Sequence, residues 1–339
     1  MKEHFSDIKH IWEELEKFED ITPFSTYTWA DNWLKIWRKT AYILSVKVSG
    51  TIAGLAPFID TMGKLRFIGY NNSDYLGFLF RPGHEQDFLE GLADELAGKN
   101  ITLLDLEHMP EKFRDIKING YEKSCFMQDV CPYITLPDSW DAYKAGLNKR
   151  FRKNIEYYWR RVNRDFNIKY EVVNKEQDVK PTLLRMVELH QKRWRSKRLP
   201  GAFYSKKIIQ FHLNAAVDLF IKGYLDLHRL IINEEIAAVL YCFHKNRSTY
   251  YYIGGFDDAY KNMSIGVLLT SAAIKTSIER KDNIFDFLRG NESYKDNFCS
   301  EKRYNYRLVF HKGLLAGMRA RVIEKGNSVI GAVKAHFES

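Results

Sequence analysis

The order of strand and helix patterns restricts the fold of this chain most, because the same order occurs twice. The first half contains two strands in 42–60 around a Ser49-Gly50 turn, a third strand at 64–70, a helical spacing at 85–96 and an apolar strand at 101–106. The last of these has the composition of a strand buried in a sheet.

The second half repeats this plan. Residues 225–257 contain three strands separated by turns at Asn233-Glu234 and Asn246-Arg247, a helix follows at 267–281, and further strands lie at 284–290 and 304–310. We therefore predict an α/β fold with mixed sheets, built from two halves of similar topology.

Length and composition agree with a two-domain globular protein. A chain of 339 residues exceeds one ordinary core, and its 45% apolar and 14% aromatic content can fill two. The formal net charge of +9 favours an anionic partner, such as a nucleotide, a phosphorylated cofactor, RNA or a membrane surface. The four cysteines show no CxxC spacing, so we expect neither a zinc site nor a disulfide framework.

The N-terminal sequence mixes charges and lacks the apolar segment of a secretory signal. No stretch approaches the roughly 18 apolar residues that a membrane span needs. These features, together with the cysteine usage, predict a cytoplasmic protein whose membrane contact, if any, is peripheral.

A basic amphipathic helix is predicted between the halves. Its apolar residues recur every three or four positions: Leu147, Phe151, Ile155, Tyr158, Val162 and Phe166. Its other faces carry Lys149, Arg150, Arg152, Lys153, Arg160, Arg161 and Arg164. Such a face is either simply solvated or contacts phosphate groups or an anionic polymer.

The strand around 284–290 carries a carboxylate in apolar surroundings. Strand alternation places Asp286 on the face of Ile284 and Leu288, where an unpaired charge is costly. Arg289 and Lys295 are the nearest cations in sequence. Asp286 is therefore either half of a structural ion pair or a general base or substrate anchor, because ligands usually lie at strand ends in open α/β sheets.

The segment 260–272 predicts a turn that leads into a helix, with Ser264 and Gly266 at the helix start. Backbone N–H groups there, with the helix dipole, suit a phosphate group. A serine at this position also occurs as an ordinary helix cap.

Three antiparallel strands, such a turn, a helix and a strand ending in polar residues together resemble the GNAT superfamily of N-acetyltransferases. In that family the turn binds the pyrophosphate of acetyl-CoA through a Gln/Arg-x-x-Gly-x-Gly/Ala pattern. The matching stretch runs from Lys261 to Gly266, with serine in place of the first glycine. The resemblance implies that acetyl-CoA contacts Lys261, Asn262, Met263, Ser264, Ile265, Gly266 and Val267, and that no metal is needed.

A closer resemblance covers nearly the whole chain. It rests on "SDYLGFLF" at 73–80, "LLDLEHMP" at 103–110, "LNKRFRKNIEYYWRRV" at 147–162, "LHQKRW" at 189–194, "YYIGGFDDAYKNMSIG" at 251–266 and "FDFLRGNESYK" at 285–295. These motifs resemble the CelD/BcsL-like acetyltransferase branch, which is related to the Fem-type peptidyltransferases. The resemblance implies two GNAT-like domains in tandem, at 1–140 and 171–339, with the basic helix at 141–170 between them.

The helix that contains "LHQKRW" places His190 on an apolar stripe with Leu183, Val187 and Trp194. A histidine there is either a bonded core residue or, as the resemblance suggests, a proton acceptor beside the acceptor cleft. In the first half, Asp74 either forms a turn or contacts the acceptor.

The interpretation as a whole is a cytoplasmic acyltransferase that moves an acetyl group to an amine. The expected catalytic residues are Asp286, Glu292 and His190, and the expected acceptor-binding residues are Trp194, Arg193, Arg289, Tyr294, Lys295, Asp74 and Tyr75. The resemblance implies an amino sugar nucleotide or another surface-polysaccharide precursor as acceptor. Two alternatives stay open: a Fem-like transferase that uses aminoacyl-tRNA, and a GNAT-fold binding protein without catalysis.

Overall fold

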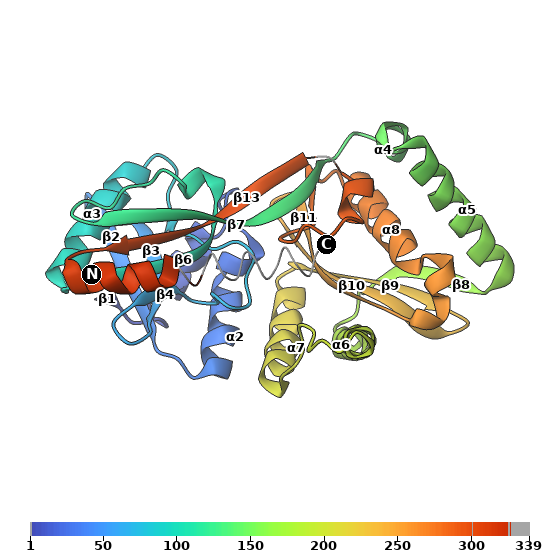
Figure 1. Cartoon of the computed structure of the whole chain (residues 1–339), viewed down its shortest axis with the longest axis horizontal. Coiled ribbons are helices and arrows are strands. Elements are labelled where there is room, and N and C mark those ends of the chain that lie inside the picture. Colours follow the sequence, from blue (N-terminus) through green and yellow to red (C-terminus); the bar gives the residue numbers. More distant parts are fainter. Residues whose placement is uncertain (1, 300, 325, 327–339) are drawn as a thin grey trace. The chain divides into compact units, whose positions relative to one another are not determined.

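The computed structural model describes residues 2–299, 301–324 and 326. They fall into two compact units. Unit 1 contains the described residues within 1–131, 289–292 and 303–326, and unit 2 contains those within 132–288 and 293–302. Each unit combines β-strands with helices (Figure 1). The predicted mixed α/β fold class is confirmed.

Unit 1 has the strand order β1-β2-β3-β4-β6-β13-β7, with β5 beside β3. Its labelled helices are α1 (Lys9–Leu15), α2 (Tyr27–Trp37) and α3 (Glu85–Gly98), and residues 314–324 are also helical. Its strands are β1 (Lys2–Glu3), β2 (Ala41–Val48), β3 (Thr51–Asp60), β4 (Leu65–Phe67), β5 (Leu79–Phe80), β6 (Leu103–Pro110), β7 (Glu122–Thr135, continuing into unit 2) and β13 (Glu301–His311). The expected turn between β2 and β3 is confirmed, since Ser49 and Gly50 both have positive φ angles.

Unit 2 has the strand order β7-β12-β11-β10-β9-β8. Its helices are α4 (Trp140–Gly146), α5 (Lys149–Asp165), α6 (Glu176–Ser196), α7 (Lys206–Ile221) and α8 (Ile265–Glu279). Its strands are β8 (Ile168–Val172), β9 (Leu225–Ile232), β10 (Glu235–Lys245), β11 (Ser248–Phe256) and β12 (Ile284–Asp286). Short 3-10 helices occupy Asp258–Met263 and Lys295–Asn297. Helices α6 and α8 cover opposite faces of this sheet (Figure 1).

The repeated plan predicted from the sequence is present in both units. In unit 1, α3 follows β4 and β5 in the chain and leads into β6. Leu65 of β4 pairs in parallel with Leu104 of β6. In unit 2, α8 connects β11 to β12, and these strands are also parallel. A crossover helix is the standard way to join parallel strands, because their ends lie at opposite edges of the sheet.

The compact units divide the chain at other residues than the expected ranges 1–140, 141–170 and 171–339. The C-terminal strand returns to unit 1 because β13 pairs with β6, with Tyr306 opposite Met109 and Phe310 opposite Leu104. The expected helix at 141–170 is two helices. The extended backbone of Leu147 ends α4, and the side chain of Asn148 caps α5.

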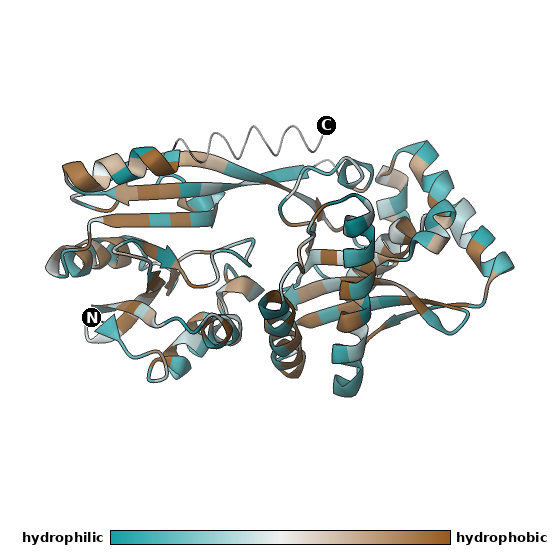
Figure 2. Ribbon diagram, turned by 60° about the horizontal axis from the view of Figure 1, so that its bottom comes forward, coloured by the Kyte–Doolittle hydropathy of each residue, from teal (hydrophilic) through white to brown (hydrophobic). Residues whose placement is uncertain are grey.

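Each unit has its own apolar core. In unit 1, α3 packs on β2 and β3 through Phe88 and Leu92, which are fully buried. In unit 2, α8 contributes Leu269 and Ile274 to a core that includes Phe285 and Phe287. Figure 2 shows hydrophobic colouring concentrated along the strands, while the helices alternate hydrophobic and hydrophilic residues. This pattern fits helices that bury one face on a sheet.

Candidate active site

Parallel pairing between β11 and β12 stops well before β11 ends. The pairing runs from Ser248 opposite Ile284 to Tyr250 opposite Asp286, whereas β11 continues to Phe256 along β10. A β-bulge lies in this continuation, since Tyr241 pairs with Ile253 and Cys242 with Tyr251. Bulges of this kind are common beside active sites, because they redirect side chains and backbone groups.

The loop after β11 leads directly into α8. Residues Asp258–Met263 form a 3-10 helix, and Ser264 then adopts a left-handed conformation with φ 49°. In this conformation the Ser264 hydroxyl makes no cap bond to α8 within the described structure. The first N–H groups of a helix have no acceptor inside the helix, and the first turn of α8 contains no acidic residue. The helix start is therefore suited to an anion.

Glycine at position 266 has a packing reason as well. A Cβ atom built there would lie 3.3 Å from the Phe256 ring, so α8 begins in close contact with the end of β11. Lys261 and Asn262 are exposed on the preceding turn, where the lysine adds positive charge. The predicted cofactor loop Lys261–Val267 thus forms one continuous turn and helix start.

Asp286 is fully buried at the end of β12. Its Oδ1 accepts the N–H of Leu288 at 2.7 Å, and Leu288 has a positive φ of 55°. The strand therefore ends at Asp286 and does not continue to 288 as the alternation had suggested, because a left-handed residue cannot extend a strand. Lys295 is also buried and donates to the Phe287 carbonyl at 3.1 Å.

His190 has hydrogen-bond partners on both ring nitrogens. Nδ1 lies 3.1 Å from the Gly254 carbonyl, which can only accept, so Nδ1 carries the proton. Nε2 then accepts the N–H of Ala202 at 3.3 Å. Burial lowers the pKa of His190, which keeps the ring neutral. This geometry favours a positioning role, in which His190 holds α6 against the end of β11.

The comparison with known families identifies the segment that contains this geometry. Residues 149–296 match the family model for an acetyltransferase (GNAT) domain. This segment is a GNAT domain. It covers less than half of the chain and includes the α8 start, the end of β12 and His190. A search among curated proteins gave no match.

Two solved structures extend the likeness over most of the chain, as fold alone. FemX is 11% identical, covers 96% of this chain and 100% of its own, and superposes with a TM-score of 0.69. L-PGS from Bacillus licheniformis is 11% identical, covers 89% of this chain and 91% of its own, with a TM-score of 0.57. The expected GNAT membership is confirmed for residues 149–296, whereas the CelD/BcsL-like branch stays a prediction.

Several further predicted residues of the GNAT domain are exposed or half-buried. Arg193 is exposed at the end of α6, and Trp194 is half-buried with the Lys197 ammonium 5.6 Å from its ring. Tyr294 is 39% exposed beside the buried Lys295. Burial raises the pKa of the Cys299 thiol to about 12, so this neighbouring cysteine stays protonated. A thiol in that state is a poor nucleophile.

The remaining predicted residues belong to unit 1. Asp74 is buried and pairs with Arg289, whose Nε lies 2.8 Å from Asp74 Oδ1. Burial raises the pKa of Asp74, and the Arg289 charge opposes that rise. Tyr75 is buried, with the Arg303 guanidinium 5.6 Å from its ring, and Glu292 is exposed. Unit 1 thus holds Asp74, Tyr75, Arg289 and Glu292, and unit 2 holds the other predicted site residues.

Sequence reasoning missed two residues that share this network. The Arg289 Nη1 lies 3.1 Å from His108 Nε2, and His108 Nδ1 lies 3.4 Å from Asp129. His108 also has a positive φ of 60°, which is uncommon outside glycine. No local motif marks this group, because its members come from four separate segments of the chain.

Sequence reasoning also missed why two glycines, Gly254 and Gly255, lie near the end of β11. A Cβ atom at Gly255 would lie 2.4 Å from the Met186 carbonyl oxygen of α6, and one at Gly254 would lie 2.7 Å from the Tyr251 hydroxyl. Gly255 therefore lets α6 pack close to the strand, whereas Gly254 leaves room for the Tyr251 and Phe256 rings. Glycine inside a strand is a signal for such close contacts.

Among the described residues, no helix is long and apolar enough to span a membrane, and no group of His, Cys, Asp and Glu side chains could hold a metal ion.

Proposed function

We propose that the GNAT domain transfers an acetyl group from acetyl-CoA to the amino group of a small acceptor, such as an amino sugar nucleotide or another polysaccharide precursor. The observation that carries this proposal is the start of α8. There, uncapped N–H groups, the left-handed Ser264 and a first turn without acids lie beside the end of β11. The pyrophosphate of acetyl-CoA meets donors of fixed position there.

The chemistry requires little beyond positioning. The amine nitrogen attacks the thioester carbonyl, a C–N bond forms, the C–S bond breaks, and CoA leaves as a thiol after taking up the proton that the amine loses. The pairing of β11 with β12 ends at Tyr250. The backbone groups of β11 after this residue do not pair with β12. They suit an extended acyl carrier and the developing oxyanion.

Asp286 is the residue we assign to proton removal from the amine. It is fully buried at the point where β12 ends, and its Oδ1 is held in place by the Leu288 N–H at 2.7 Å. Tyr294 and Lys295 follow in the same unit, and we assign them to the acceptor. The exposed Arg193 and half-buried Trp194 complete this assignment from α6.

The test is product formation from acetyl-CoA and a panel of amino sugar nucleotides, followed by mass spectrometry. Asp286→Asn keeps an oxygen for the Leu288 N–H bond but removes the charge. We expect a folded protein with unchanged CoA affinity and a kcat lower by roughly 10²–10⁴-fold. His190→Gln is the comparison variant. If His190 only positions α6, this substitution should lower the stability of the protein more than it lowers kcat.

Wild-type protein that binds acetyl-CoA but acetylates none of the amines would contradict the acceptor class. Wild-type protein that binds no acyl-CoA would contradict the proposed reaction and favour the non-catalytic alternative. Full activity in Asp286→Asn would remove this residue from the mechanism.

The second candidate function is a Fem-like transfer from aminoacyl-tRNA, which the basic face of α5 favours. Arg150, Lys153, Arg160 and Arg164 are exposed on this helix. If α5 binds RNA, replacing Arg160, Arg161 and Arg164 with glutamine should reduce the slope of log affinity against log salt by roughly one unit per lost phosphate contact. Absence of any salt-sensitive tRNA binding by the wild type would exclude this function.

A further inference from the structure

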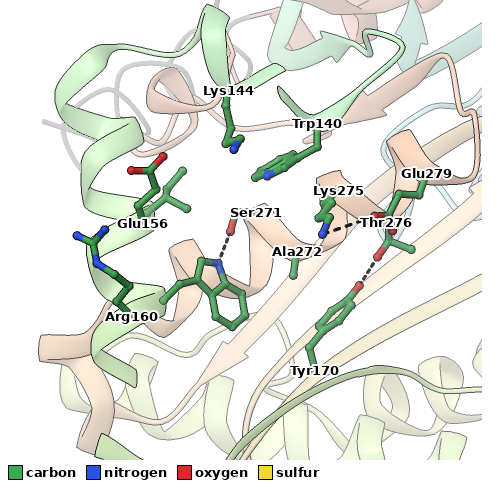
Figure 3. Close-up of a pocket in the computed structure, with 12 residues that line it drawn as sticks. Trp140, Lys144, Glu156, Arg160, Tyr170, Ser271, Ala272, Lys275, Thr276 and Glu279 are labelled. Carbon is green, nitrogen blue, oxygen red and sulfur yellow. Dashed lines mark hydrogen bonds and ion pairs between the residues drawn. The ribbon is translucent and has the colours of Figure 1, made fainter. Parts of the chain in front are cut away.

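A cavity in unit 2 lies on the side of α8 that faces α4 and α5. Its volume is about 580 Å³, within the usual range for small-molecule sites. Residues of α4, α5, β8 and α8 line it (Figure 3). None of the loop residues 261–267 lines this cavity.

The cavity has three aromatic walls, two of which are held by hydrogen bonds. The Trp159 indole N–H donates to Ser271 Oγ at 3.4 Å. The Tyr170 hydroxyl lies 2.8 Å from Thr276 Oγ1 and 2.8 Å from His228 Nδ1. Trp140 is half-buried on α4 above them (Figure 3). Rings fixed in this way present flat apolar surfaces without loss of side-chain freedom on binding.

The polar lining carries charges of both signs. Lys275 pairs with Glu279 at 3.6 Å, and Lys144 pairs with Asp141 at 2.8 Å. Arg160 and Glu156, both exposed on α5, have no ion-pair partner among the described residues. A ligand that is complementary to this lining therefore has an anionic group, N–H donors and a flat face.

The position along α8 separates this cavity from the proposed acyl-carrier loop. Ser271 and Lys275 lie six and ten residues after Ile265, which corresponds to roughly 9 and 15 Å along the helix axis. One ligand group at the helix start and another in the cavity are therefore distinct sites on the same helix.

We propose that this cavity binds a purine nucleoside phosphate. The base stacks on the tryptophan rings, and the Glu156 carboxylate accepts its N–H groups. Arg160 and Lys144 bind the phosphate. A flat base is complementary to the aromatic walls, and a phosphate is complementary to the cationic side chains. A purely apolar ligand would leave both the cationic side chains and the Glu156 carboxylate without a partner in the ligand. A free nucleotide and a nucleotide of single-stranded RNA share this chemistry.

The experiment is calorimetric titration of the full chain with AMP, GMP and ribose 5-phosphate, in the absence and presence of saturating 4′-phosphopantetheine, which has the acyl-carrier arm of CoA but no purine. We expect AMP or GMP to bind at least tenfold more tightly than ribose 5-phosphate, with affinity unchanged by 4′-phosphopantetheine. Arg160→Gln and Trp140→Leu should each weaken nucleotide binding roughly tenfold. Arg150→Gln is the matched control, because it removes the same charge from the same helix outside the cavity.

A parallel titration with an oligoadenylate RNA distinguishes the two sources. Tighter binding of the oligomer than of AMP, with the same loss in Arg160→Gln, assigns the site to RNA, and the reverse order assigns it to a free nucleotide. The proposal is overturned if neither purine nucleotide nor oligomer binds, or if Arg150→Gln weakens AMP binding as much as Arg160→Gln. Because CoA binding is measured separately, failure here leaves the proposed acyl-transfer function to its own test.

Discussion

Helices α3 and α8 have the same topological role but opposite electrostatics at their first turns. Each connects antiparallel strands to a strand that pairs in parallel. Helix α3 begins with Glu85 and Asp87, and His84 lies 3.2 Å from Asp87. Helix α8 begins after the left-handed Ser264 without any acid. The carboxylates in the first turn of α3 already interact favourably with the positive end of its helix dipole. Of these two helices, α8 is therefore the one suited to bind an external anion.

The two units also differ in their buried histidines. Burial lowers the pKa of His190, of His212 to about 3 and of His228 to about 4, and all three belong to unit 2. In unit 1, burial would raise the pKa of Asp105, but hydrogen bonds from Arg307 and Lys64 hold it below its usual value. The units should therefore respond to acid over different pH ranges.

The largest expected effect is the loss of unit 2 stability on acidification. Below the unfolded pKa of about 6.5, the unfolded chain binds protons that the buried histidines do not, so stability falls as pH falls toward about 4. Each histidine contributes up to roughly 1.4 kcal/mol per pH unit. Asp105 stabilises unit 1 above its unfolded pKa of about 3.9, and this contribution is lost only at lower pH.

Hydrogen exchange measured from pH 7 to pH 4, resolved by peptide, checks this difference. His212→Phe should reduce the pH dependence by about one proton. Equal loss of protection in the two units over this range would remove the distinction.

The next largest effect is expected when the α3 pattern is transferred to α8. Gly266→Glu places a carboxylate at the second helical position, and its Cβ atom meets the Phe256 ring at 3.3 Å. We expect CoA affinity to fall at least 100-fold, about 2.7 kcal/mol. Lys261→Glu, on an exposed residue, tests the charge effect without this crowding.

The matched control is Gln86→Glu, which adds the same charge at the second position of α3. Its CoA affinity should equal that of the wild type. If Gly266→Glu folds and binds CoA normally, or if Gln86→Glu weakens binding equally, the acyl carrier does not bind at the start of α8.

The smallest expected effect concerns Ser264, whose φ of 49° favours glycine. Ser264→Gly should change the free energy of unfolding by less than about 1 kcal/mol, because relief of strain opposes the greater freedom of the unfolded chain. Ser264→Val should be less stable than Ser264→Gly by about 1–2 kcal/mol. Chemical denaturation measures both, and equal stability of the two variants would contradict the left-handed conformation.

For comparison, His84 before α3 has a negative φ of −111°. His84→Gly gains no relief of strain, so it should lower stability where Ser264→Gly does not.

The repeated order of elements was predictable from sequence because it depends on local patterns. Turns at Ser49-Gly50, Asn233-Glu234 and Asn246-Arg247 all have the positive φ angles that such residue pairs tolerate. The start of α8 near Ser264 was predictable for the same reason, since a helix boundary is set by adjacent residues.

Contacts between distant segments required the tertiary structure. The return of β13 to β6, the bonds of His190 to Gly254 and Ala202, and the pairing of Asp74 with Arg289 join residues far apart in the chain. Asp286 shows the limit most clearly. Its sequence context predicted a buried carboxylate, but the end of the strand at that residue depends on the left-handed backbone of Leu288. Sequence patterns record which face a residue occupies, whereas partner choice depends on how separate elements pack, and packing is a property of the whole chain.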